Sequence, residues 1–394
     1  MNNKLNQLCC IPLLFVATSC FSEEQEGFYF ATFKWLPKLT LQQQRNDNVL
    51  SSEENAKTSN ITLLSPSLGI EADRKYTQYS LLYNADKAEY INSHADDFLD
   101  QRLQANLQMA FSSRSRLKTS AKYYFLHQNR GTGYSQGIGA VLDRPDKYNI
   151  RELGGIYSYG TQESNGRIEL GLDFSVQRFE NRRATIFLGN RNHLDSHFTF
   201  YYRVRPKTSL LVEVRNTEID YRVEAGEPTL DNNEKRFLLG ASWNVTAITQ
   251  GLAKFGVLRK DFVNKSRQDF TGFSWQLGAR WRPWTYSRFE IKTLGGTDET
   301  IGTGDFIESQ SAQLGWQHDW SAPLTTLLQG SVTRNTFHPT GLAEGIVSVG
   351  LRLDYKMRYW LEFGIGLTHT ERLSNLIGQD YKQNLLSLEM SVKI

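Results

Sequence analysis

The chain has 394 residues, a mean hydropathy of −0.48 and a formal net charge of +3 at pH 7. No apolar run beyond the N-terminus is long enough to cross a bilayer as a helix, which excludes a helical membrane protein. The small net charge and the lack of blocks of like charge argue against a nucleic-acid partner.

The N-terminus has the three parts of a secretory signal peptide, which we expect to span residues 1–22. Lys4 supplies a positive start, Leu8–Ala17 a short apolar core, and Thr18–Ser22 mostly small residues for cleavage. Cleavage after Ser19 and cleavage after Ser22 both fit the pattern. The segment therefore predicts export across the inner membrane.

The cysteines all lie within or beside this signal, at Cys9, Cys10 and Cys20. The mature chain therefore has at most one thiol and no internal disulfide. Lipidation of Cys20 is an alternative, but Ala17 stands where a lipobox usually has leucine.

Further along, apolar and polar residues alternate in one segment after another. Successive side chains of a strand point to opposite faces, so each such segment predicts a strand with one apolar and one polar face. A clear example has Ile168, Leu170, Leu172, Phe174 and Val176 on one parity. About 18 segments of roughly 9–13 residues have the length that a tilted strand needs to cross a membrane.

The links between these segments alternate between short and long. Asp73–Lys75 and Arg205–Lys207 are short links, whereas Arg130–Asp146 and Asn216–Glu234 are long ones. Outer-membrane barrels have tight turns on the periplasmic side and long loops outside. The alternation therefore favours a membrane barrel over a soluble β-sandwich.

The last segment, Asn384–Ile394, is the most regular. Its apolar parity, which we expect to face lipid, consists of Leu386, Leu388, Met390, Val392 and Ile394. In lipid every backbone N–H and C=O must be paired within the protein, so an all-β membrane chain has to close on itself. We predict that this segment is the closing strand.

The sequence thus predicts an all-β fold, a transmembrane antiparallel up-and-down β-barrel of about 18 strands, with 16 as the alternative. We expect residues 23–34 to form a short periplasmic segment and residues 35–394 the barrel. At this size the interior leaves an aqueous channel. A large soluble or periplasmic all-β protein such as a propeller is the less favoured fold, because no internal repeat has blade spacing.

The stretch Trp35–Gly131 has a characteristic layout. It runs through RNDNV, SPSLGIEA, YSLLYNADKAEY and DDFLDQRLQANLQMAF to a basic and aromatic strand that ends at Arg130 and Gly131. This layout resembles the second of the two families named putative β-barrel porin, which occur with exopolysaccharide and capsule biosynthesis systems. The resemblance implies a location in the cell outer membrane of a Gram-negative bacterium and a part in polysaccharide export.

If the apolar parity faces lipid, the polar parity lines the lumen. The lumen-lining candidates are Arg102, Lys118, Lys122, Arg280, Arg282, Arg288, Lys292, Arg352 and Trp360. Mixed charge of this kind solvates any wide pore. The basic strip formed by Arg280, Arg282, Arg288 and Lys292 would also suit the guidance of an anionic polymer.

His193, Asp195 and His197 share one parity. Metal binding or acid–base chemistry is conceivable there, although residues two apart on a strand are widely spaced for a single metal ion. No nucleophile motif or phosphate-binding loop occurs elsewhere. We therefore expect no enzyme, no metal and no cofactor.

The leading hypothesis is a passive or partner-gated pore for exopolysaccharide or capsule export. Its expected partners are outer-membrane lipid, anionic polysaccharide and secretion-system proteins, with the oligomeric state left open. A second hypothesis is a general or solute-specific diffusion porin for uptake, whose sign would be a constriction loop inside the barrel; Arg130–Asp146 and Asn216–Glu234 are long enough to supply one. A third is an outer-membrane enzyme acting on lipid or polysaccharide.

Overall fold

The computed structural model of the chain describes residues 27–161, 163–223, 229–244 and 248–393. The expected signal peptide, with its cleavage and lipidation alternatives, lies outside the described residues, as does Ile394. Among the described helices, none is long and apolar enough to span a membrane.

The structure is almost entirely β. The strands are β1 Phe28–Phe30, β2 Phe33–Asn46, β3 Ser59–Arg74, β4 Thr77–Tyr90, β5 Phe98–Ala110, β6 Ser115–Gln128, β7 Asp146–Tyr159, β8 Gly166–Phe179, β9 Arg191–Arg205, β10 Thr208–Tyr221, β11 Asn232–Asn244, β12 Thr249–Phe262, β13 Phe270–Trp284, β14 Ser287–Glu299, β15 Phe306–Asp319, β16 Leu324–His338, β17 Leu342–Arg358, β18 Leu361–Ser374 and β19 Tyr381–Lys393. Short 3-10 helices are η1 His94–Asp96, η2 Gly133–Ser135, η3 Gly139–Val141 and η4 Phe187–Gly189.

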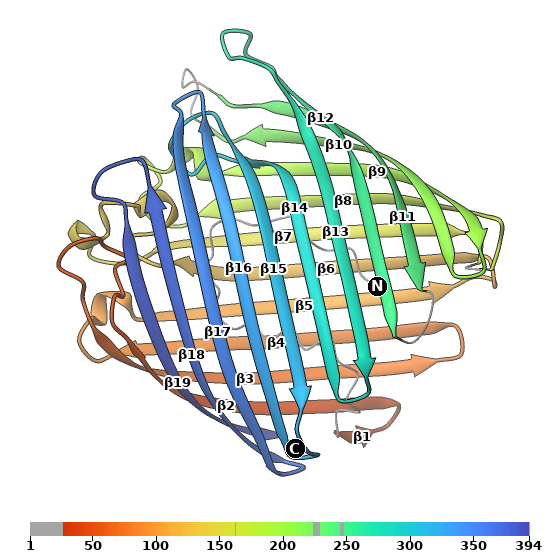
Figure 1. Cartoon of the computed structure of the whole chain (residues 1–394), viewed down its shortest axis with the longest axis horizontal. Coiled ribbons are helices and arrows are strands. Elements are labelled where there is room, and N and C mark those ends of the chain that lie inside the picture. The colour runs from red at the N-terminus through yellow and green to blue at the C-terminus, as the bar shows by residue number, and fades with distance from the viewer. Residues whose placement is uncertain (1–26, 162, 224–228, 245–247, 394) are drawn as a thin grey trace.

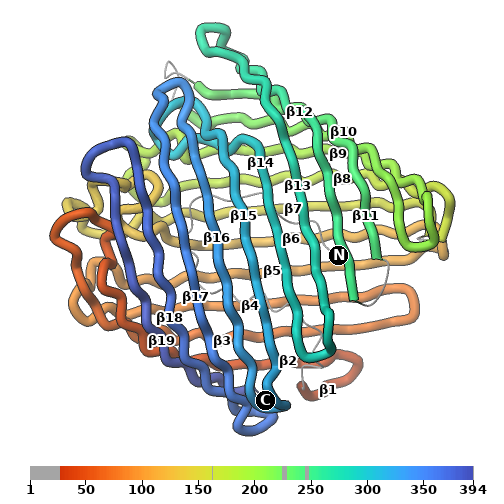
Figure 2. The backbone as a smooth tube through the Cα atoms, viewed as in Figure 1, coloured from red at the N-terminus to blue at the C-terminus, as the bar shows by residue number. Residues whose placement is uncertain are grey.

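Strands β2 to β19 form one closed wall (Figures 1 and 2). Each strand pairs antiparallel with the next, and β19 pairs with β2 from Leu385↔Asn46 to Lys393↔Lys38. The predicted antiparallel barrel is confirmed, with 18 strands rather than 16. Each of these strands therefore has a paired neighbour on both sides, as the backbone requires in lipid.

The short strand β1 extends the closing seam. Pairing between β19 and β2 ends at Lys393↔Lys38, and β1 pairs with the next part of β2, from Phe28↔Trp35 to Phe30↔Phe33. In its described part, the expected periplasmic segment of residues 23–34 therefore contains β1 and the start of β2. Strand β1 covers backbone groups of β2 that β19 does not reach.

The links between strands differ in length at the two ends of the barrel. Residues 75–76, 206–207 and 285–286 form tight turns at one end, whereas loops L1 (residues 47–58) and L4 (residues 180–190) lie at the other. The long link expected at Asn216–Glu234 is shorter, residues 222–231, because β10 and β11 extend into it. One link at the long-loop end, residues 339–341, is short.

The apolar and polar side chains of the closing strand β19 lie on opposite faces of the wall, as their alternation in the sequence predicts. Leu386, Leu388 and Met390 are exposed on the outer face, and the half-buried Val392 shares their parity. Ser391, on the inner face, is buried and its hydroxyl lies 2.9 Å from that of Thr40. The apolar side chains thus lie where lipid would surround the barrel.

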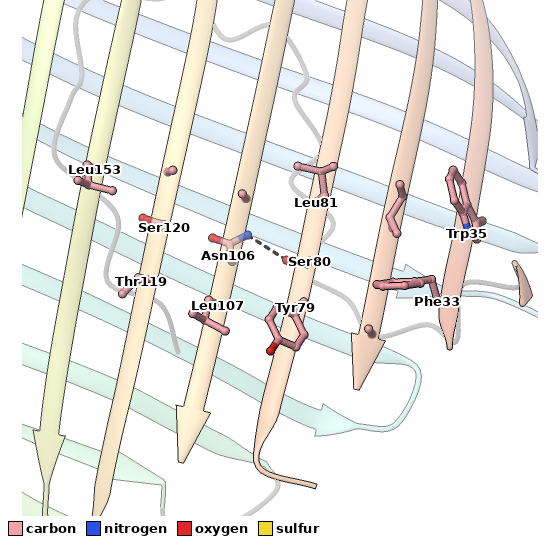
Figure 3. A pocket seen from close by; sticks show the side chains of 14 residues that line it. Phe33, Trp35, Tyr79, Ser80, Leu81, Asn106, Leu107, Thr119, Ser120 and Leu153 are labelled. Atoms are coloured by element: carbon pink, nitrogen blue, oxygen red, sulfur yellow. Dashed lines mark hydrogen bonds between the residues drawn. The ribbon is translucent and has the colours of Figure 1, made fainter. Parts of the chain in front are cut away.

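The outer wall is hollowed over β2 to β7, where small side chains such as Ala72, Ala105 and Ala121 stand between larger ones such as Leu153 (Figure 3). The depression has a volume of about 520 Å³. Because most of its lining has the outward, apolar parity, it faces lipid rather than the lumen.

Near the long loops the wall parts between β13 and β14, and the ends of β14 and β15, which remain paired with each other and with β16, turn inward. Strands β13 and β14 pair only from Trp275↔Gly295 toward the tight-turn end. Beyond that point Phe306 of β15 packs with Ile219 and Phe262 from the inner faces of β10 and β12. In Figure 1 the β12–β13 hairpin continues past the end of β14. The interior is therefore narrowed at the long-loop end.

Candidate functional site

Loop L3 (residues 129–145), between β6 and β7, lies inside the barrel. Arg130, Thr132 and Ser135 are buried. The Tyr134 hydroxyl donates a hydrogen bond of 3.0 Å to the carbonyl of Thr300, and Gln136 Nε2 donates one of 3.3 Å to Glu344 on β17. Because β17 lies far from β6 in the order of the wall, these contacts carry L3 across the lumen.

A buried ion pair fixes the start of L3. Arg130 Nε lies 2.7 Å from Asp96 Oδ1 and Arg130 Nη2 lies 2.8 Å from Asp96 Oδ2, a bidentate geometry. Arg130 also donates to Ser93 and to the carbonyl of Leu142. The hydrogen bonds to Asp96 raise the pKa of the Arg130 guanidinium, against the effect of burial, so Arg130 keeps its positive charge at neutral pH.

A second ion pair fixes the end of L3. Asp146, at the first position of β7, is fully buried and accepts hydrogen bonds from Arg182 of L4, one of them 2.6 Å long. Gly131 has φ +84°, and a Cβ there would lie 1.7 Å from the carbonyl oxygen of Leu50 in L1. L3 is thus held at both ends and packs closely on L1.

The inner wall of β9 to β12 is densely charged, and many of its charged side chains form ion pairs. Lys254 Nζ lies 2.5 Å from Glu213, and Lys260 Nζ lies 2.5 Å from Glu299 and 3.6 Å from Glu234. Both lysines are completely buried. Glu299 reaches Lys260 because the end of β14 turns inward. Glu213 also pairs with Arg215, and Glu234 with Arg236, so each of these carboxylates has a cationic partner. These paired side chains narrow the lumen.

The structure brings together part of the expected histidine constellation. Ligand atoms of Asp173, Asp195 and His197 lie within 4.8 Å of one another, whereas His193 is not part of this group. Arg215 Nη1 lies 3.1 Å from Asp195 Oδ1 and already neutralises that carboxylate. Asp173 was not among the residues expected here, because it is brought alongside by the cross-strand pairing Asp173↔Asp195, which the sequence does not reveal.

Several lumen-lining candidates are held by carboxylates. Arg102 pairs with Asp86, Lys122 with Glu152, Arg280 with Glu290, and Arg352 with Asp354 and Glu389. Trp360, expected on the polar face of a strand, instead lies in the link of residues 359–360 and is exposed. Strand parity does not apply to a residue in a turn.

The basic strip keeps an excess of positive charge. Its four members, Arg280, Arg282, Arg288 and Lys292, lie on β13 and β14, and the single carboxylate of Glu290 serves both Arg280 (2.7 Å) and Arg288 (3.8 Å). Among the described residues, Arg282 and Lys292 have no carboxylate partner within ion-pair distance, and neither has Lys118 on β6.

A small hollow of about 110 Å³ adjoins Lys292. Its polar lining is amide and hydroxyl, from Gln313, Gln329, Ser331, Ser348 and Thr368, and the charged side chains of Glu290 and Lys292 also line it. Such groups donate and accept hydrogen bonds in both directions. The strip and the hollow together suit a hydroxylated solute that carries a negative charge.

Comparison with known proteins agrees with this architecture. The family model described as "Putative beta-barrel porin 2" matches residues 23–394. No curated protein sequence matches the chain. Among solved structures, OccK2 (OpdF) of Pseudomonas aeruginosa is similar with a TM-score of 0.50 and 12% identity, over 94% of this chain and 100% of that one.

The same values hold for the OccK2 (OpdF) structure in complex with glucuronate. A BenF-like porin from Pseudomonas fluorescens Pf-5 has a TM-score of 0.49 and 10% identity, over 91% of this chain and 99% of that one. At these identities the similarity concerns the fold.

Proposed function

Because the chain belongs to the family described as "Putative beta-barrel porin 2", we propose that it is a diffusion channel of the Gram-negative outer membrane for small anionic, hydroxylated solutes. L3 sets the width of its lumen, and the basic strip with the adjoining hollow sets its preference. Residues 1–22 direct its export.

The observation that carries this proposal is the path of L3 across the lumen. A loop held inside a wide barrel by two buried ion pairs limits the size of the solutes that can pass. A conduit for long polymers would not need such a constriction. The solved structure of OccK2 (OpdF) with glucuronate, a sugar acid, supports a solute of this class. The proposal needs no catalytic step and no cofactor.

Polysaccharide export, which the resemblance implies, remains the second candidate function. It requires L3 to leave the lumen, for instance when a secretion partner binds. Locking L3 in place would then abolish export of the polymer, whereas flux of small solutes would continue.

The test is solute flux into liposomes that contain the purified full chain. Glucuronate, glucose and glucosamine are similar in size and differ in charge, so their relative rates report charge preference. We expect glucuronate to enter fastest, and Lys292→Gln together with Arg280→Gln to remove most of its advantage over glucose. Lys382→Gln, on the outer face and paired with Glu371 at 3.0 Å, is the matched control. Equal rates for all three solutes would contradict the charge preference, and no flux at all would contradict the channel.

A further inference from the structure

Three arginines gather on the outer surface at the long-loop end of β7 to β10. Arg151 of β7 and Arg222, directly after β10, are exposed, and Arg178 of β8 is half-buried between them along the wall. Among the described residues, the charged side chains that lie near enough to affect Arg178 are Arg151 and Arg222, and no carboxylate is among them. Like charges gathered without a counter-ion repel one another, so the group favours an anion.

The position of the cluster relative to lipid follows from strand parity. Arg151 continues the outward series of the exposed Leu153, and Arg178 continues that of the exposed Phe174. On both strands the apolar series therefore ends in an arginine on the side of the long loops. That is the level at which headgroups of the outer leaflet meet the barrel wall.

The central guanidinium is held in place by neutral acceptors. Arg178 Nη1 donates to the carbonyls of Gln177 (2.6 Å) and Arg191 (3.0 Å), and Arg178 Nη2 donates to Asn192 Oδ1 (2.6 Å). Arg151 lies over the ring of Tyr123, with its guanidinium carbon 5.9 Å from the ring centroid. An arginine fixed without an acidic partner can offer its charge to a ligand at little further cost in conformational entropy.

Several other outward cations at this end have a carboxylate beside them. Lys87 pairs with Glu89, Arg259 with Asp261, and Lys382 with Glu371. Arg45 and Arg334 are exposed without such a partner among the described residues, but neither belongs to a cluster of this kind. The arginine cluster thus gathers three positive charges that no described carboxylate balances. The contrast points to a ligand for Arg151, Arg178 and Arg222.

We propose that Arg151, Arg178 and Arg222 form a binding site on the outer wall for the phosphate groups of lipopolysaccharide, the phosphorylated glycolipid of the outer leaflet. Guanidinium groups bind phosphate through paired N–H donors, and clustered basic residues at a membrane surface recognise anionic headgroups. The acyl chains of the same lipid would lie along the apolar side chains of β7 and β8. The site is separate from the lumen, so it does not depend on the solute that the channel passes.

The test measures binding of lipid A to the detergent-purified full chain by native mass spectrometry. Because Arg178 also supports backbone carbonyls, the diagnostic variant is Arg151→Gln with Arg222→Gln, which leaves those hydrogen bonds in place. We expect this double variant to bind lipid A at least fivefold more weakly than the wild type does. We also expect the wild type to bind lipid A that lacks phosphates no more tightly than the double variant binds lipid A. Lys382→Gln, which removes a balanced charge from the same face, should bind as the wild type does.

Wild-type affinity in the double variant would overturn the proposal, as would an equal loss in the Lys382 variant. Competition by inorganic phosphate at millimolar concentration would also overturn it, because the site would then be one for a free anion. Folding of each variant is checked by its resistance to unfolding in cold SDS.

Discussion

The ion pair between Arg130 and Asp96 offers the sharpest test of how L3 is held. Arg130→Met keeps the aliphatic stem and removes the guanidinium, which leaves the Asp96 carboxylate, with a side chain only 7% exposed, without its bidentate partner. Removing one partner of a buried ion pair costs about 3–5 kcal/mol. At about 1.4 kcal/mol per factor of ten, the conformation of L3 that crosses the lumen loses roughly two to three and a half orders of magnitude in relative population.

The cost falls on L3 and not on the barrel wall, because both residues lie beyond the ends of the wall strands. We therefore expect the variant to fold as a barrel and, in planar bilayers, to show a larger and noisier single-channel conductance. Arg130→Met combined with Asp96→Asn should recover part of the wild-type behaviour, because no buried charge is then left unpaired.

Arg144→Met is the control, since Arg144 belongs to the same loop but pairs with Asp143 in an exposed position. It should conduct as the wild type does. A folded Arg130→Met channel with wild-type conductance and noise would refute the view that this pair holds L3 across the lumen.

Three further predictions follow from the same structure. Met390→Arg, on the outer face of the closing strand, should destabilise the barrel by about 2–4 kcal/mol in a lipid-refolding titration, whereas Ser387→Arg, on the inner face, should cost much less; equal costs would contradict the assigned faces. Because no cysteine follows residue 20, a Gln136→Cys, Glu344→Cys pair should be joined by a short bifunctional thiol reagent and quieten the channel, and failure to cross-link in the folded barrel would place L3 elsewhere. Zinc should leave the thermal stability of the wild type unchanged but raise that of Arg215→Gln, because Asp195 then no longer pairs with a guanidinium and can bind the metal with Asp173 and His197. An equal rise in both proteins would mean that the ion pair between Arg215 and Asp195 does not block metal binding.

The wall of the barrel could be predicted from the sequence because the alternation of apolar and polar residues within each strand depends only on neighbouring positions. In a strand that faces lipid on one side and water on the other, the parity of each residue fixes its environment, as Leu388 and Glu389 illustrate on β19. The seam between β19 and β2 then follows from the need to pair every backbone group. The position of strand β1 could not be predicted in this way, because β1 pairs with the part of β2 that β19 leaves unpaired.

The interior could be predicted only in part. The length of the Arg130–Asp146 link indicated that a constriction loop was possible, but its path depends on contacts such as Tyr134 to Thr300, which are distant in sequence. Nor does strand parity show that the wall parts between β13 and β14 near the long loops. Lys292 was recognised as an inward cation, whereas the hollow beside it is formed by side chains from four other strands.

The most direct test of the account is the single-channel conductance of a variant in which residues 133–141 are replaced by a short Gly-Ser linker. This change removes the part of L3 that crosses the lumen and keeps Arg130 and Asp146 with their partners. We predict a folded barrel whose conductance is several times that of the wild type and whose preference for glucuronate over glucose is reduced. An unchanged conductance would mean that L3 does not set the width of the channel, and would contradict the proposed function at its centre.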